Sequence, residues 1–312
     1  MKVTNIYNLP QALVEAVTTE RHNNDGEYSA TTLLKGACET ILTKRHWDDI
    51  LVDASESIWQ VFGTAVHSIF EKQKDNTFKE EFFSVDVSAS KVTGRVDSYD
   101  LENEILVDWK TASVWKVIKQ DFADWKRQGL IYSWLMNKCG LTVKKCKFIA
   151  LLKDHSKADA RNKPDYPKQP IYIFEFDVTA EDLANIETFI EARVKALEFA
   201  DTLKDEELTP CSTEERWTTP EKWAHMKEGR KSAIKLYDTE EEAAKVELKK
   251  DEYIEHRPGE NKKCDNYCNC KEWCPLFKKE EEKKKVEACK ICDKQHDNCK
   301  YACNCSTLVE VE

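Results

Sequence analysis

The order of strand-like and helix-like segments constrains the fold of this chain most. Between residues 80 and 112, three consecutive segments are rich in β-branched and aromatic residues, which predicts neighbouring strands with the polar "DLENE" as a turn before the third. Helical spacing then alternates with further strand-like segments. The predicted elements are strands at 80–89, 91–99, 104–112, 144–153 and 171–178, and helices at 115–138 and 179–203. This series predicts an α/β core built on one sheet.

Two helical regions precede the strands. Residues 29–47 predict a short helical pair behind a serine or threonine cap. Residues 55–73 predict a longer helix, and its apolar residues are expected to form a broad buried face; they are Ile58, Trp59, Phe62, Val66, Ile69 and Phe70. Gly63, His67 and Glu71 fall one turn apart on a different stripe of that helix.

Length and composition indicate a globular protein of one large domain and a smaller appendage. The chain has 312 residues, of which 41% are apolar and 34% charged. We expect a core over 1–205 that includes a polar loop or flap at 154–170, then a small α/β appendage over 206–260 and a cysteine-rich tail over 261–312. No segment resembles a signal peptide or membrane span, so an intracellular location is expected, in bacterial or phage-infected host cytoplasm. A net charge of −10 argues against nonspecific coating of nucleic acid.

The strands around the "DLENE" turn carry charges that an ordinary hairpin does not need. Asp97 lies in one strand and Asp108 in the next, and Lys110 shares the face of Asp108 because strand side chains repeat every second residue. Two nearby carboxylates repel, and a divalent cation such as Mg²⁺ or Mn²⁺ relieves that repulsion. A cation with a neighbouring lysine can activate water for phosphodiester hydrolysis.

Neighbouring residues extend this candidate site. His67 can add an imidazole ligand, and Gly63 removes side-chain bulk one turn earlier. Gln128 and Tyr132 fall on one face of the helix at 115–138. Each group also has a purely structural interpretation. Asp97, Asp108 and Lys110 can be a surface charge pattern, and His67 can be a partly buried, hydrogen-bonded histidine. Gln128 and Tyr132 can be one ordinary helix face.

The order of these groups resembles the PD-(D/E)XK nuclease superfamily, specifically its RecB-like exonuclease branch, which includes phage recombination nucleases and CRISPR-associated iron–sulfur exonucleases. The matching segments are "GTAVHSIFE" (63–71), "GRVD" (94–97), "DWK" (108–110) and "QGLIY" (128–132). The resemblance implies a restriction-endonuclease-like core with a central mixed sheet flanked by helices.

The resemblance also implies roles for individual residues. His67, Asp97, Asp108 and the carbonyl of Trp109 would bind Mg²⁺ or Mn²⁺, and Asp97, Asp108 and Lys110 would be catalytic. Gln128 and Tyr132 would bind the DNA strand, and Glu71 would lie in the outer sphere of the metal.

Three functions remain open at this point. The first is a metal-dependent deoxyribonuclease, an exonuclease that processes DNA ends in recombination, repair or replication. It would act alone or beside a separate helicase or single-strand annealing protein, since the chain has no P-loop motif. The second is an exonuclease of CRISPR spacer acquisition. The third is a non-catalytic nucleic-acid-binding protein held together by metal at its cysteines.

Nine of the thirteen cysteines fall between residues 264 and 305, which predicts a metal-binding tail. By resemblance, a 4Fe-4S cluster would use Cys38 with Cys264, Cys268 and Cys274, and Cys270 would be surplus; structural Zn²⁺ is the alternative. A second possible metal site consists of Cys289, Cys292, Cys299, Cys303 and Cys305, with His296 as an additional candidate. Cys139, Cys146 and Cys211 are expected to be small buried residues.

Overall fold

The computed structural model describes residues 1–18, 25–73 and 77–291, with side chains up to residue 283. The chain consists of two units, Met1–Leu203 and Lys204–Glu312. The subdivision of the second unit into an appendage and a tail stays a prediction. No helix in the described part of the chain is both long and apolar enough to span a bilayer.

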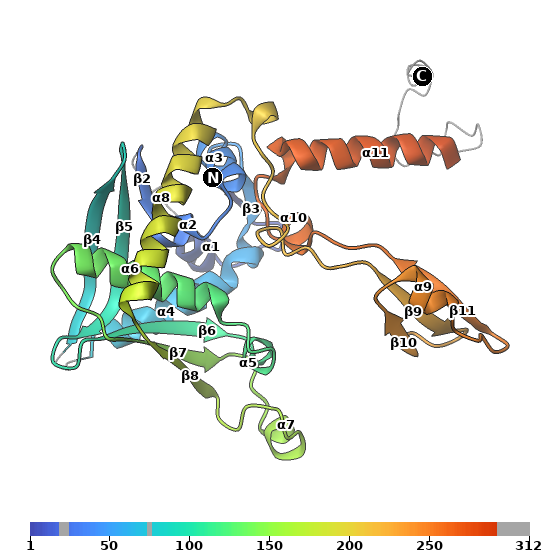
Figure 1. Cartoon of the computed structure of the whole chain (residues 1–312), viewed down its shortest axis with the longest axis horizontal. Helices are drawn as coiled ribbons and strands as arrows, with labels where there is room; N and C mark the ends of the chain where they lie inside the picture. The colour runs from blue at the N-terminus through green and yellow to red at the C-terminus, as the bar shows by residue number, and fades with distance from the viewer. Residues whose placement is uncertain (19–24, 74–76, 292–312) are drawn as a thin grey trace. The chain divides into compact units, whose positions relative to one another are not determined.

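A six-stranded mixed sheet forms the centre of the first unit (Figure 1). Strands β2 and β5 run parallel, as do β6 and β7, whereas the pairs β4–β5, β5–β6 and β7–β8 are antiparallel. The prediction of a central mixed sheet flanked by helices is therefore confirmed. The strands are β2 (Glu27–Ser29), β4 (Thr77–Val87), β5 (Ser90–Asp100), β6 (Ile105–Ala112), β7 (Lys145–Leu152) and β8 (Ile171–Asp177).

Helices cover the two faces of this sheet. Helix α6 (Ala123–Lys138) packs across β4, β5, β6 and β7, and α8 (Ala180–Thr202) packs on α6 and on α3 (Ala37–Arg45). Helix α4 (Ile58–Glu71) contacts β5 and β6. Because strand side chains alternate, Lys110 of β6 faces α6 and Trp109 faces α4.

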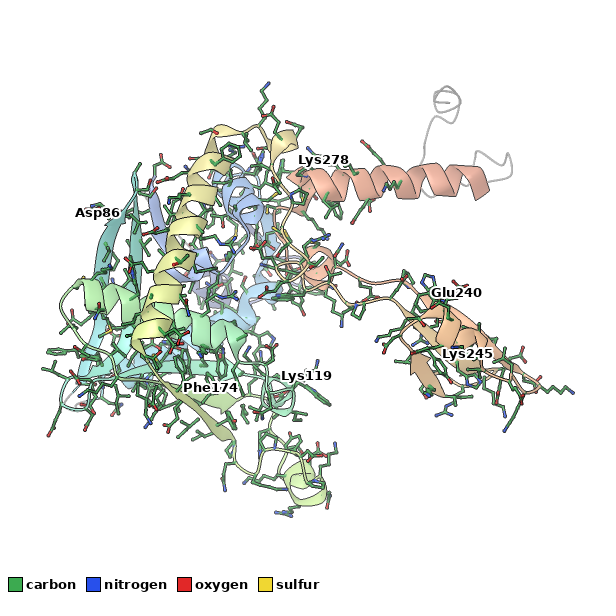
Figure 2. All side chains as sticks on the ribbon, viewed as in Figure 1. Asp86, Lys119, Phe174, Glu240, Lys245 and Lys278 are labelled. Carbon is green, nitrogen blue, oxygen red and sulfur yellow. The ribbon has the colours of Figure 1, made fainter. Side chains whose placement is uncertain are left out.

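Local sequence explains where several of these elements begin. The Ser29 hydroxyl accepts a hydrogen bond from the Thr32 backbone N–H at the start of α2 (Ala30–Leu33). Thr179 and Asp182 form a capping box at the start of α8. Aromatic rings fill the space between α6 and the sheet: Phe122 stacks on Phe174 with centroids 4.6 Å apart, and Phe174 is labelled in Figure 2.

Two predicted boundaries are wrong. The helix expected over 115–138 is divided into α5 (Val114–Ile118) and α6, because Gln120 between them has a φ of 53°, which no α-helix accommodates. The expected loop at 154–170 contains a helix, α7 (Lys157–Asn162). Ser156 caps that helix, and its backbone N–H donates to the hydroxyl of buried Tyr166 at 2.8 Å.

The broad buried face predicted for residues 55–73 is also wrong. Trp59 is 60% exposed and Ile69 is 57% exposed, and among the six apolar residues Val66 alone is fully buried. The stripe that faces the sheet instead contains Gly63, where an added Cβ would lie 3.7 Å from the Thr111 hydroxyl oxygen, and His67. Helical spacing therefore identified the helix but assigned its inner face incorrectly.

The remaining elements of the first unit are short. They are β1 (Lys2–Thr4), α1 (Gln11–Val17), β3 (Leu51–Asp53) and the 3₁₀ turn Ala54–Ser57, and β1 pairs with β3 in parallel.

The second unit contains a three-stranded antiparallel sheet in the order β10, β9, β11. The elements are β9 (Lys222–Lys227), β10 (Lys235–Tyr237), α9 (Glu240–Ala244), β11 (Glu252–Arg257), α10 (Lys262–Asn266) and α11 (Pro275–Ile291), with 3₁₀ turns at Asp205–Glu207 and Lys271–Trp273. Ala224, Met226 and Ala243 are buried between the sheet and α9. An α/β composition was predicted for 206–260, and these elements agree with it.

Candidate active site

The candidate site lies where strands β5 and β6 separate. Strand β4 pairs along β5 from Ser90 to Asp100 with one interruption, so β2 and β6 must share the other edge. Strand β2 covers residues 91–93 of that edge, and β6 covers 98–100. The edge of residues 94–97, the "GRVD" segment, is thus left open between two strands, and the Asp97 side chain fills part of the opening.

Asp97 connects β5, β6 and α4 at this opening. Its Oδ2 accepts a hydrogen bond of 2.7 Å from the Trp109 backbone N–H, beyond the last paired residues of the two strands. Its Oδ1 lies 3.2 Å from Nδ1 of His67. Hydrogen bonding to Asp97 raises the pKa of His67, although burial opposes the shift. The imidazole and the carboxylate predicted as metal ligands are therefore brought together.

Glu80 is a site residue that the sequence did not reveal. The register places it opposite Asp97, and the ladder is interrupted there, because Lys79 pairs with Ser98 and Glu81 pairs with Val96. Like charges directly opposite each other destabilise a sheet. Glu80 also has a φ of 54°, a strained value for this residue type. Opposed carboxylates together with a strained backbone are kept in a protein where a function requires them.

His67, Glu80 and Asp97 form a compact group of possible metal ligands. One ligand atom from each side chain lies within 4.8 Å of the others. Burial, followed by the negative charges of Asp97 and Glu71, raises the pKa of Glu80. Only the strand register could have identified Glu80, because "EEFF" by itself reads as part of an amphipathic strand.

Asp108 and Lys110 form an ion pair on the face of β6 opposite to the Trp109 ring, the face toward α6. Nζ of Lys110 lies 2.6 Å from Oδ1 of Asp108, which is 2% exposed. Among the described residues Oδ1 has no polar partner besides Lys110, so it can accept a further ligand. Burial is the main cause that raises the pKa of Asp108 from 3.8 to about 6, and the charge of Lys110 opposes it while that of Asp97 adds to it.

Gln128 of α6 contacts this ion pair, and Tyr132 of the same helix contacts Gln128. The Gln128 Oε1 accepts a hydrogen bond of 2.9 Å from Lys110 Nζ, and its Nε2 lies 3.5 Å from Asp108 Oδ2 and 3.2 Å from the Tyr132 hydroxyl. Both side chains are buried, each with 7% exposure. In the free protein they therefore position Asp108 and Lys110, and contact with DNA stays a prediction.

Close packing of α6 on β5 explains why the "GRVD" segment has a glycine, Gly94. A Cβ at this position would lie 2.8 Å from Leu135 Cδ1 and 2.9 Å from Tyr132 Cε1. Real Cβ atoms do not approach other atoms so closely. The glycine therefore allows α6 to lie near enough to β5 for Gln128 and Tyr132 to reach β6.

The other two predicted residues surround the site. The Trp109 ring stacks on Phe70 of α4 with centroids 3.7 Å apart, which fixes the end of α4 against β6. Its carbonyl as a metal ligand stays a prediction. Glu71 is exposed at the end of α4, close enough to Glu80 to affect its pKa, and its outer-sphere role also stays a prediction.

The donor set fits a divalent cation that prefers oxygen and tolerates one imidazole. Two carboxylates and His67 converge, and buried Asp108 lies close enough for the charges of Asp97 and His67 to affect its pKa. Mn²⁺ and Mg²⁺ accept this combination, whereas Zn²⁺ generally takes more nitrogen or sulfur ligands.

The predicted cysteine ligands fall in different units. Cys38 is buried on α3 of the first unit, whereas Cys264, Cys268, Cys270 and Cys274 lie in the second. Cys289 lies within α11, but its side chain is outside the described residues, as are Cys292, Cys299, Cys303, Cys305 and His296. Of the cysteines expected to be small buried residues, Cys146 is buried and Cys211 is half-buried, whereas the prediction is wrong for Cys139, which is exposed at the end of α6.

No protein-family model matches this sequence, and no curated protein matches it. Among solved structures, the protein SSO0001 is similar with a TM-score of 0.41 and 16% identity, over 56% of this chain and 78% of that one. LHK-Exo, an alkaline exonuclease from Laribacter hongkongensis, was solved in complex with dAMP. It is similar with a TM-score of 0.37 and 14% identity, over 56% of this chain and 89% of that one. A phage-related exonuclease from Haemophilus somnus is similar with a TM-score of 0.29 and 13% identity, over 52% of this chain and 71% of that one. All three TM-scores lie below 0.5, so these similarities carry no conclusion about function.

Proposed function

We propose that this protein is a Mg²⁺- or Mn²⁺-dependent deoxyribonuclease, an exonuclease that hydrolyses phosphodiester bonds at DNA ends. The observation that carries this proposal is the convergence of His67, Glu80 and Asp97 within 4.8 Å beside the ion pair of Asp108 and Lys110. The preference for DNA ends and a role in recombination, repair or replication, alone or beside a helicase or annealing protein, follow from the sequence resemblance.

In this proposal His67, Glu80, Asp97 and Asp108 hold the cation, with the Trp109 carbonyl as a further ligand. When bound, the cation would polarise a phosphoryl oxygen and lower the pKa of a bound water. Protonated His67 and a cation compete for the same carboxylates, so metal affinity should fall as the solution becomes acidic.

Lys110 would orient the attacking water, and only in its neutral form would its amine accept the proton that this water loses. Its ammonium group is held between Asp108 and Gln128, at 2.6 and 2.9 Å, which fixes it at the open part of the sheet. Its side chain is 21% exposed, so a water and a phosphate can reach it. Gln128 and Tyr132 keep the pair in place, and we propose that they also contact the DNA strand.

A nuclease assay with end-labelled linear and circular DNA tests the proposal, using Mg²⁺, Mn²⁺ or EDTA. We expect cleavage of linear DNA with metal, none with EDTA, and a loss of about 10²- to 10⁴-fold for Lys110→Ala, the range for a general acid–base group. The matched control is Lys91→Ala, an exposed lysine of β5 outside the site, which should cleave normally.

Cleavage by Lys110→Ala at the rate of the Lys91→Ala control would refute the proposal. DNA binding that is indifferent to metal, with no cleavage product, would instead favour the non-catalytic alternative.

A further inference from the structure

Arg95, the second residue of the "GRVD" segment, lies beside the candidate metal ligands. It precedes Asp97 by two positions on β5, so the two side chains extend to the same face of the strand. Its Nη1 donates a hydrogen bond of 3.1 Å to the carbonyl oxygen of Glu80. Glu80 thus contributes its carboxylate to the group of possible ligands and its carbonyl to Arg95, which holds the guanidinium next to that group.

The guanidinium of Arg95 keeps most of its hydrogen-bonding capacity. The residue is exposed, and within the described part of the chain it makes one hydrogen bond, to Glu80, and no ion pair. A guanidinium has five N–H donors in a planar fork that matches the oxygens of a phosphate. Four of these donors therefore remain for an anionic ligand that approaches from solvent.

Phe82 of β4 lies directly opposite Arg95 in the strand register. The guanidinium carbon is 5.9 Å from the centroid of the ring, and the ring is nevertheless 56% exposed. Among the described strands β4 pairs with β5 alone, so its outer side is open to solvent (Figure 1). Single exposed apolar side chains are common on proteins. This ring differs from them because an arginine and a group of possible metal ligands lie next to it.

An aromatic ring and an arginine side by side match the two parts of a nucleotide. Bases stack on aromatic side chains, and arginine binds phosphate through two parallel hydrogen bonds. Neighbouring strands lie only about 5 Å apart, so one nucleotide can reach both side chains. A base inside a duplex has both faces covered by its neighbours in the stack, so it must leave the stack before a ring of the protein can cover it.

We propose that Arg95 and Phe82 form a subsite for an unpaired nucleotide, so that the site takes a single strand or a single-stranded DNA end. Arg95 binds a phosphate of that strand, and Phe82 stacks on the base. The subsite rests on the proposed function, because the strand is cut at the metal held by His67, Glu80 and Asp97. Two residues of a β-strand span about 7 Å, so the phosphate at Arg95 is a neighbour of the one that is cut.

Binding of a labelled single strand of about ten nucleotides, followed by fluorescence anisotropy, tests the subsite. The full-length chain is used in EDTA, so that no metal-dependent cleavage occurs. We expect Arg95→Gln and Phe82→Ala each to weaken binding about tenfold, and Phe82→Trp to bind at least as tightly as the unaltered protein. The matched controls are Lys91→Gln, an exposed lysine of β5, and Phe78→Ala, a 47% exposed ring of β4, and both should bind normally.

The salt dependence of this binding separates a phosphate contact from a structural role. The logarithm of the association constant falls with the logarithm of the salt concentration by about 0.7 for each phosphate of a single strand that the protein neutralises. Arg95→Gln should therefore make the slope less steep by about 0.7. Phe82→Ala should leave the slope unchanged, because stacking neutralises no phosphate.

A blunt-ended duplex of the same sequence tests the requirement for an unpaired base. Both variants should bind it like the unaltered protein, and losses equal to those for the single strand would overturn the subsite. Normal single-strand binding by either variant would overturn it as well, even if the unaltered protein cleaves DNA with metal. Weakened binding by both variants would support the subsite even if the unaltered protein cleaves nothing, in which case the proposed nuclease function alone would fail.

Discussion

Asp108 should destabilise the metal-free protein at neutral and alkaline pH. Its side chain is 2% exposed, and burial raises its pKa from 3.8 to about 6. A carboxyl group with a raised pKa in the folded state favours folding while it is protonated, and the benefit is lost as the pH rises through the folded value. The difference between the two pKa values corresponds to about 3 kcal/mol at pH 8.

Asp108→Asn removes the ionisable group while it conserves the shape of the side chain. The variant gives up the ion pair with Lys110, which still donates to Gln128, so about 3 kcal/mol is an upper limit to its advantage. We expect the variant to be about 1 to 3 kcal/mol more stable than the unaltered protein at pH 8 in EDTA. Near pH 4 Asp108 is mostly protonated in the folded state. There the gap between the two proteins in free energy of unfolding should be smaller by about 2 kcal/mol.

Urea denaturation at the two pH values measures this gap. The control is Asp165→Asn, an exposed position whose stability change should stay within about 0.5 kcal/mol at both. Adding Mg²⁺ at 100 times its Kd should stabilise the unaltered protein by about 2.7 kcal/mol and the Asp108→Asn variant far less.

A gap that does not widen between pH 4 and pH 8 would refute this account of Asp108. So would a variant that is less stable than the unaltered protein at pH 8, because the ion pair would then outweigh the cost of burying the carboxylate.

Two further predictions concern residues that position the site. Glu80→Gln should lower Mn²⁺ affinity at least about tenfold in a calorimetric titration, because it removes one negative charge from the ligand group. Glu81→Gln, on the exposed side of β4, is the control and should bind Mn²⁺ normally. Equal affinities of the two variants would exclude Glu80 as a ligand. Gly94→Ala should lower the free energy of unfolding, measured by urea denaturation, by about 1 to 3 kcal/mol, because its Cβ clashes with Leu135 and Tyr132. Gly63→Ala should be neutral or stabilising, because the added Cβ makes only an ordinary contact. A neutral Gly94→Ala would show that α6 can shift away from β5.

The sequence determined the order of the elements and most of the candidate ligands. Periodicities of two and of 3.6 residues placed the strands and most helices, because alternation in strands and spacing in helices are local properties. The same alternation placed Asp108 and Lys110 on one face, where they form an ion pair. The "GRVD" and "DWK" segments identified the two strands that separate at the site.

Only the tertiary structure decided which side chains meet. Glu80 becomes a candidate ligand through the register of β4 against β5, and register is a long-range property that no short segment records. The same limit explains α4, since spacing defines an apolar stripe but packing decides which stripe is covered. Local patterns thus determined the elements, and the pairing of distant segments determined the sites.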